Sequence, residues 1–166
     1  TRLKVVGYED FGPGNSRRGT APKLGEPLTV GCVVEAGAWG SFTETIEGWL
    51  FAREQVTELA GATLTVHGIL PPGNKVPQRV LRQVDGMGVT FAGPLSTLDL
   101  AARAHDFGLL MVISRPELPP VRAANYLLAG PRIVWCTQQK PPEGHPLAES
   151  SAVWATNNLT PQAFVG

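Results

Sequence analysis

The residue types that hold metals or form covalent intermediates are scarce in this chain. It has two cysteines and three histidines among 166 residues, and none stands at the spacing of a zinc site. No Gly-x-Ser-x-Gly sequence occurs, and neither cysteine has a basic neighbour, so the pattern of a hydrolase nucleophile is missing. We therefore expect no bound metal and assign no catalytic residue. Cys32 and Cys136 lie in apolar runs, which favours buried free thiols, with a disulfide as the alternative.

The chain also lacks net charge and long apolar stretches. Fourteen basic and fourteen acidic residues cancel, which argues against a nonspecific nucleic-acid binder. No apolar run approaches the roughly 20 residues of a membrane helix, and the N-terminus has no signal-peptide pattern. We expect a soluble, cytoplasmic protein. Because the chain opens at Thr1 rather than at methionine, we also expect a processed or excised piece.

What the chain has is a regular alternation of short apolar runs and helical patterns. With 43% hydrophobic residues, 19 glycines and 15 prolines, the composition indicates a folded core with many loops. Nearly continuous apolar runs are typical of strands buried on both faces of a parallel sheet. They fall at residues 3–6, 28–34, 62–66, 89–92, 109–113, 133–136 and 152–155.

Helical patterns separate these strands. Ser41 and Glu44 have the spacing of a capping box and predict a helix over 41–59. Further helices are predicted at 76–84, 96–105 and 119–130. The fold class that follows is α/β, a Rossmann-like, doubly wound, mainly parallel sheet of about six strands with helices on both faces. We expect one domain, in which residues 1–27 add a first strand and a Gly/Pro/Arg-rich loop to a lobe at 28–166.

Two junctions between a strand and a helix carry residues suited to an anion. The first, at 35–43, contains Gly37, Gly40 and Ser41, but Gly40 stands where a P-loop needs lysine. It is either a turn that packs helix on strand or a site built from backbone amides. The second, at 114–130, places Arg115 and Glu117 between a buried strand and a helix N-terminus, where open α/β sheets bind ligands.

His67 is the one histidine placed at the end of a strand. It precedes Gly68, so it belongs to the predicted edge of the sheet where ligands bind. A structural histidine buried in the fold is the other interpretation. The remaining histidines, His105 and His145, are scattered and suggest no site.

The second junction resembles the donor-binding motif of retaining glycosyltransferases with the GT-B fold. In that family two glutamates are separated by seven residues, and the second opens a run like Glu-Ala-Met-Ala-x-Gly-x-Pro-Val-Val. Here Glu117 is followed after seven residues by Asn125, which opens the run 125–134. The segments at 62–68, 89–100 (with Gly93 after its strand) and 104–114 resemble the preceding elements of the family in order and spacing, so the likeness covers about 28–160.

The resemblance implies the C-terminal lobe of a GT-B enzyme, which binds a nucleoside-diphosphate sugar as substrate and needs no other cofactor. Carried over, Glu117 contacts sugar hydroxyls, the amides of Leu118, Pro119 and Pro120 are placed at sugar and diphosphate, and Asn125 holds the ribose. Proline lacks an amide donor, so this end of the helix is weakened as an anion site. Asn125 offers one acceptor oxygen where the family has a carboxylate.

The family's Arg and Lys, which stabilise the leaving diphosphate after the first strand of this lobe, have no counterparts. Glu35, Trp39 and Gly40 lie there instead. Arg115, Arg122 or the pair Arg17 and Arg18 would have to substitute for them. The predicted activity is hexosyl transfer, provided that a second lobe supplies the acceptor site.

Two other functions fit the residues. One is a non-catalytic GT-B-like module that binds a protein partner, with Trp39 and Trp49 as exposed anchors. The other is a degenerate relative of MinD/ParA-type P-loop proteins, against which the missing lysine counts. Neither a nucleic-acid partner nor a membrane span is expected.

Overall fold

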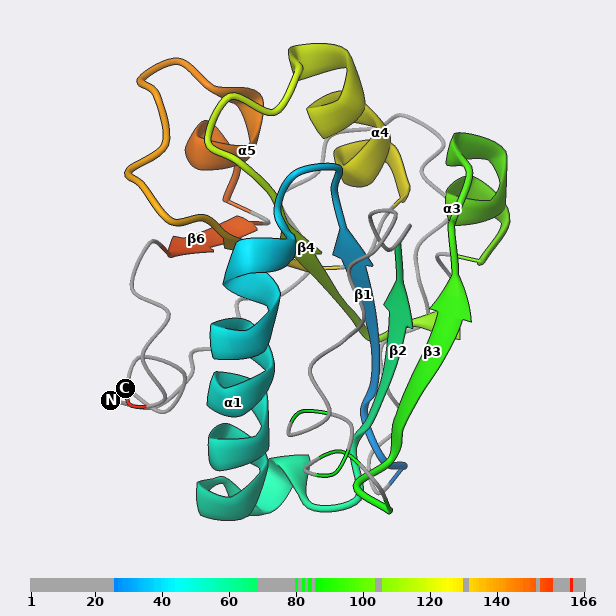
Figure 1. Ribbon diagram of the computed structural model, residues 1–166. Coiled ribbons are helices and arrows are strands. Elements are labelled where there is room, and N and C mark those ends of the chain that lie inside the picture. Colours follow the sequence, from blue (N-terminus) through cyan, green and yellow to red (C-terminus); the bar gives the residue numbers. More distant parts are fainter. Residues whose placement is uncertain are drawn as a thin grey trace.

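A six-stranded β-sheet forms the centre of the protein, and every pair of neighbouring strands in it is parallel (Figure 1). The strands are ordered β3-β2-β1-β4-β5-β6, which is the order of Rossmann-type doubly wound sheets. The predicted fold class is confirmed. The strands are β1 Thr29–Val34, β2 Thr63–His67, β3 Val89–Gly93, β4 Leu109–Ile113, β5 Arg132–Cys136 and β6 Val153–Thr156.

The computed structural model describes residues 26–68, 80, 82, 84, 86–103, 106–129, 132–151, 153–156 and 162. The predicted strand at 3–6, the loop with Arg17 and Arg18, and His105 lie outside these residues. Most of the predicted helix at 76–84 does so too, although Val80, Arg82 and Val84 are helical. The predicted division at residue 27 is not tested.

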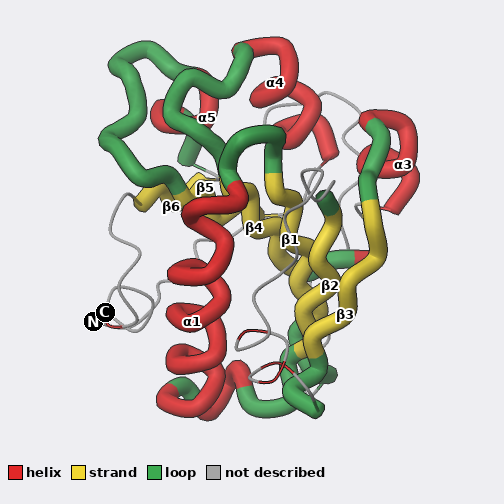
Figure 2. The backbone as a smooth tube through the Cα atoms, viewed as in Figure 1, coloured by secondary structure: helices red, strands yellow, loops and turns green. Residues whose placement is uncertain are grey.

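Helices cover both faces of the sheet (Figure 2). Residues of α1 pack on one face against side chains from β1, β2 and β4, while residues of α3, α4 and α5 pack on the other. The helices are α1 Trp39–Gln55, α3 Thr97–Arg103, α4 Pro120–Ala129 and α5 Pro146–Glu149, with a 3-10 turn, η2, at Thr57–Leu59. The short helix α5 has no counterpart in the sequence prediction.

Strand β4 shows why the apolar runs are nearly continuous. Met111 and Ile113 join the core beneath α1, whereas Leu110 and Val112 join the core beneath α3 and α4. These four side chains are at most 1% exposed. A central parallel strand covered on both faces needs apolar residues at every position.

The predicted cap of α1 is wrong. The helix begins at Trp39, two residues before Ser41, and its N-cap is Ala38, which makes no side-chain capping bond. Ser41 is therefore inside the first turn and buried. By contrast, the Ser96 hydroxyl accepts a hydrogen bond from the Asp99 amide at 3.1 Å and donates to its carboxylate at 2.6 Å, which is a capping arrangement at the start of α3.

Both cysteines are buried free thiols, as predicted. Burial raises the pKa of Cys136 to about 12, and burial, together with the neighbouring Cys136, raises the pKa of Cys32. The two side chains stay protonated and act as small apolar groups in the core beneath α1.

Candidate functional site

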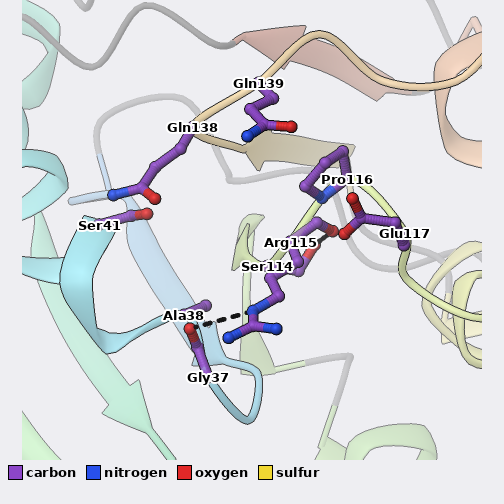
Figure 3. A pocket seen from close by; sticks show the side chains of 9 residues that line it. All are labelled: Gly37, Ala38, Ser41, Ser114, Arg115, Pro116, Glu117, Gln138 and Gln139. Atoms are coloured by element: carbon purple, nitrogen blue, oxygen red, sulfur yellow. Dashed lines mark hydrogen bonds between the residues drawn. The ribbon is translucent and has the colours of Figure 1, made fainter.

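A pocket lies between β1 and β4, where the order in which the chain adds strands to the sheet reverses. From β1 the strand order runs one way through β2 and β3, and from β4 it runs the other way through β5 and β6. The loops that follow β1 and β4 therefore diverge and leave a crevice at the carboxyl ends of the strands. Its volume is about 300 Å³. The described residues that line it are Gly37, Ala38, Ser41, Ser114, Arg115, Pro116, Glu117, Gln138 and Gln139 (Figure 3).

One wall is the turn from β1 to α1, and it requires glycine at position 37. Gly37 has a φ of 78°, and a Cβ there would lie 3.1 Å from the guanidinium of Arg115. Figure 3 shows the Arg115 side chain reaching across to this turn, where its Nε donates to the Gly37 carbonyl at 3.5 Å. A larger residue would both strain the backbone and displace the cation.

The same wall presents the N-terminus of α1. This helix has no acidic residue in its first turn and no side-chain cap, so its positive end is not neutralised locally. Ser41 lines the pocket although the residue is only 3% exposed, and its hydroxyl makes no hydrogen bond to a described residue. In Figure 3 this hydroxyl points into the pocket on the same side as Gln138. A hydroxyl in the pocket lining can donate a hydrogen bond to a ligand oxygen.

The opposite wall, the loop from β4 to α4, is held in place at both of its ends. The Trp135 indole N–H donates to the Ser114 hydroxyl at 2.7 Å, and that hydroxyl donates to the Arg115 carbonyl at 2.9 Å. At the other end the Leu118 carbonyl lies 2.8 Å from His145 Nε2. Nε2 must be the donor, because His145 Nδ1 accepts the Leu147 amide. Arg115 and Glu117 are thus displayed by a braced loop.

An ion pair joins the β1–α1 turn to helix α4, and neither of its residues lines the pocket. Arg122 Nε, on α4, donates to Glu35 Oε1 at 2.8 Å, and the Tyr126 hydroxyl donates to the same oxygen. Burial and the adjacent carboxylate of Glu35 both raise the pKa of Tyr126, so the phenol stays neutral. Burial favours loss of the proton from Arg122, but its contacts with Glu35 and Tyr126 outweigh this and raise its pKa.

The structure brings part of the predicted site together. Arg115, Glu117, Gly37 and Ser41 line one pocket, although they come from two junctions that the sequence analysis treated separately. A Cβ on Gly40 would lie 3.7 Å from Gln138 Nε2, so this residue borders the pocket.

Other predicted residues lie away from the lining. The Leu118 side chain is buried in the core, Pro119 is exposed, Pro120 begins α4, and Asn125 is partly buried on α4 outside the pocket lining. The role of Asn125 at a ribose stays a prediction.

Sequence reasoning missed Ser114, Gln138, Gln139 and the bracing residue His145. The two glutamines could have been identified from their position in the sequence. Gln138 and Gln139 follow the apolar run of β5 just as Glu117 follows that of β4. The predicted anchor Trp49 is wrong, because it is 3% exposed in the core. The large apolar side chains that are exposed among the described residues are Phe91 and Trp154.

His67 and Gly93 lie at the ends of β2 and β3, outside the pocket lining. The His67 ring is 1% exposed, packs edge-on against Phe107, and has no hydrogen-bond partner for either nitrogen among the described residues. Burial and, secondarily, the positive charge of Arg103 lower its pKa. The Gly93 backbone acts in the opposite direction without reaching hydrogen-bond geometry.

This buried neutral imidazole predicts a loss of stability in mild acid. The unfolded chain binds a proton at His67 below about pH 6.5, whereas the folded chain resists it, so stability is fully present above that pH. As the pH falls toward the lowered folded pKa, the free energy of unfolding should drop by up to about 1.4 kcal/mol per pH unit. Urea denaturation from pH 7.5 to 5.5 checks this. In His67→Leu the drop should be smaller, and an identical drop in both proteins contradicts the assignment.

Within the described ranges, no group of three or more His, Cys, Asp or Glu side chains is arranged to hold a metal ion. The described helices are also too short or too polar to cross a bilayer.

Comparisons with known proteins place the chain in no family. No family model matches it, and no curated protein does. Among solved structures it is similar to scyllo-inositol dehydrogenase from Lactobacillus casei, determined with NAD(H) and scyllo-inositol bound. The identity is 16% and the TM-score 0.37, with 67% of this chain covered. The chain spans 28% of that dehydrogenase, and the likeness is too distant to carry a function.

Proposed function

We propose that this protein is a donor-binding lobe of a glycosyltransferase, which binds a nucleoside-diphosphate sugar in the pocket between β1 and β4. The observation that carries the proposal is the meeting of a cation, an uncapped helix N-terminus and a serine hydroxyl in the lining of one pocket. Arg115, the first turn of α1 and Ser41 supply these three features. All three favour an anionic oxygen-rich group such as a phosphate.

In this proposal Arg115 replaces the Arg and Lys that glycosyltransferases of the GT-B family carry after the first strand of this lobe and that this chain lacks. It follows β4 rather than β1, yet its guanidinium crosses to Gly37 in the β1–α1 turn. A fixed cation at this position stabilises the charge that develops on a departing diphosphate. Arg122, which the sequence also suggested for this role, is held by Glu35 at 2.8 Å, so Arg115 is the better assignment.

The rest of the lining suits a sugar. The Glu117 carboxylate is exposed in the pocket and accepts hydrogen bonds from hydroxyl groups. Gln138 and Gln139 both donate and accept, which matches the two-way hydrogen bonding of a polyol. An acceptor lobe is still required for transfer, so the lobe supplies donor binding and leaving-group stabilisation.

A dinucleotide is the second candidate, favoured by the strand order and by the β1–α1 turn. Gly37 and Gly40 have the spacing of the last two glycines of G-x-G-x-x-G, with Glu35 at the first position. That fingerprint also needs an acidic residue near the end of β2 for the ribose, where this chain has the buried His67. Glu35 replaces the first glycine of the fingerprint, and the acidic residue near the end of β2 is missing. Both departures count against a dinucleotide, so the nucleoside-diphosphate sugar is the better candidate.

Calorimetry and thermal shift with UDP, GDP and ADP, their glucose esters and NAD⁺ test the proposal. We expect one diphosphate to bind and to raise the melting temperature. Arg115→Gln should weaken that binding about tenfold, because it removes a charge-assisted hydrogen bond. Glu117→Gln should weaken binding of the glucose ester more than binding of the diphosphate alone.

Arg103→Gln is the matched control. It removes an arginine at the end of α3 that forms an exposed ion pair with Asp106 at 3.7 Å, so ligand affinity should stay at the wild-type value. A wild-type protein that binds none of the nucleotides at millimolar concentration overturns the proposal. Binding of NAD⁺ alone points instead to the dinucleotide.

A further inference from the structure

Gly40 lies in the first turn of α1, at a position where neither the backbone nor the packing requires glycine. The positive φ of Gly37 is not shared by Gly40. Among the described residues, the one atom within 4 Å of a Cβ built on Gly40 is Gln138 Nε2, at 3.7 Å, which is an ordinary van der Waals contact. Because glycine is less favourable than alanine in a helix, stability alone favours alanine at this position.

The backbone amide of Gly40 is available to a ligand in the pocket. Gly40 is exposed, and it is followed by Ser41, which lines the pocket. The first amides of an α-helix have no partner within the helix. The Ser41 amide reaches the Ala38 carbonyl at 3.1 Å, whereas the Gly40 amide makes no hydrogen bond to a described residue. It can therefore donate to an anion at the positive end of α1.

Gln138, which follows β5, faces Gly40 from the other side of this part of the pocket. Ser41 is 3% exposed, and its hydroxyl points into the pocket on the same side as Gln138 (Figure 3). Because a Cβ on Gly40 would already touch Gln138, no ligand atom could lie between them in an alanine variant. Glycine leaves this gap open to a ligand oxygen, which can accept from the Gly40 amide and from both side chains.

Glu117 lies on the opposite side of the pocket from Ser41 and Gln138 (Figure 3). In this view the guanidinium of Arg115, whose Nε is 3.5 Å from the Gly37 carbonyl, lies between the two sides. A carboxylate repels phosphate, but it accepts hydrogen bonds from sugar hydroxyls. The donors at α1 and the carboxylate therefore divide the pocket into an end that suits phosphate and an end that suits hydroxyl groups.

We propose that Gly40 and Gln138 bound a phosphate subsite at the α1 end of the pocket, and that the ligand extends from there with its sugar toward Glu117. This inference deepens the proposed function and rests on it for the identity of the ligand. Glycine at position 40 costs helix stability, but it exposes an amide and leaves room for a phosphate oxygen. Gly40→Ala separates stability from binding, because it strengthens the helix and closes the subsite.

Calorimetry and thermal unfolding of Gly40→Ala test the subsite. The probes are inorganic pyrophosphate, the diphosphates of uridine, guanosine and adenosine, and their glucose esters. The ligand-free variant should melt about 2 °C above wild type. Its affinity for pyrophosphate, and for the diphosphate and glucose ester that wild type binds, should fall about tenfold. The ratio of ester to diphosphate affinity should stay at the wild-type value, since the substitution is at the phosphate end. Gly40→Leu, which fills more of the gap, should bind more weakly still.

Gln55→Ala is the matched control. It places alanine at the exposed last residue of the same helix, at the end away from the pocket, so every affinity should stay at the wild-type value. Wild-type affinities in Gly40→Ala and Gly40→Leu overturn the inference alone. A loss confined to the glucose ester does so too, because it places the sugar at Gly40.

The proposed function and the subsite can fail separately. If wild type binds pyrophosphate but none of the nucleotides, the proposed function is overturned, and a weaker affinity for pyrophosphate in Gly40→Ala still supports the subsite. If wild type binds none of the probes, both are overturned. A melting temperature of Gly40→Ala below that of wild type shows that the fold itself requires glycine at this position, which overturns the inference.

Discussion

Replacing Trp135 by alanine is expected to lower the free energy of unfolding by about 3–5 kcal/mol. Trp135 is fully buried in β5 and belongs to the core beneath α3, α4 and α5. Its ring stacks on His145 with a centroid distance of 4.6 Å, and its indole N–H donates to the Ser114 hydroxyl. The alanine variant therefore loses apolar burial, leaves a cavity and frees one end of the loop that carries Arg115. Urea denaturation measures the loss.

Trp135→Phe divides this effect into packing and hydrogen bonding. Phenylalanine keeps much of the ring stacking but lacks the donor to Ser114, and we expect a loss of about 1–2 kcal/mol. Because the loop is less well held, the phenylalanine variant should also have a lower affinity for the nucleotide that we propose as the ligand. A loss below 1 kcal/mol in Trp135→Ala would falsify the view that this side chain is central to the core.

The strands were predictable from the sequence because burial on both faces leaves a simple local signal. The apolar run of β4 was assigned correctly, residue for residue. Helix starts were less predictable, since Ser41 and Ser96 have the same capping spacing and the structure uses the second alone. In the first case the helix already begins at Trp39, and Ser41 lines the pocket.

The candidate site was partly predictable for a related reason. Residues after strand ends, such as Arg115 and Glu117, are identified locally because parallel strands deliver their loops to one edge. That the β1 and β4 loops meet at one pocket depends on strand order, which no local pattern shows. The pairing of Glu35 with Arg122, 87 residues later, is equally invisible in the sequence.

Gly31→Val is expected to destabilise the protein by about 3 kcal/mol, near the upper end of the range for overpacking. Gly31 lies in β1, between β2 and β4. A Cβ built on it would lie 2.8–2.9 Å from three ring atoms of Phe107, including Cγ. The ring is 5% exposed and packs against His67, so it has little room to move. Strand propensity alone predicts that the substitution stabilises the protein, because valine has a higher strand propensity than glycine.

A double-mutant cycle with Phe107→Ala assigns the effect to this contact. The single change at Phe107 should cost about 3–5 kcal/mol through its cavity, but the valine at position 31 fills part of that space. We therefore expect Gly31→Val/Phe107→Ala to be at least about 1 kcal/mol more stable than the sum of the single losses predicts. If urea denaturation instead gives additive losses of unfolding free energy, the valine destabilises the strand without any contribution from its contact with Phe107. A coupling of the expected sign identifies the reason that β1 carries glycine at this position: the Phe107 ring occupies the space that a side chain would need.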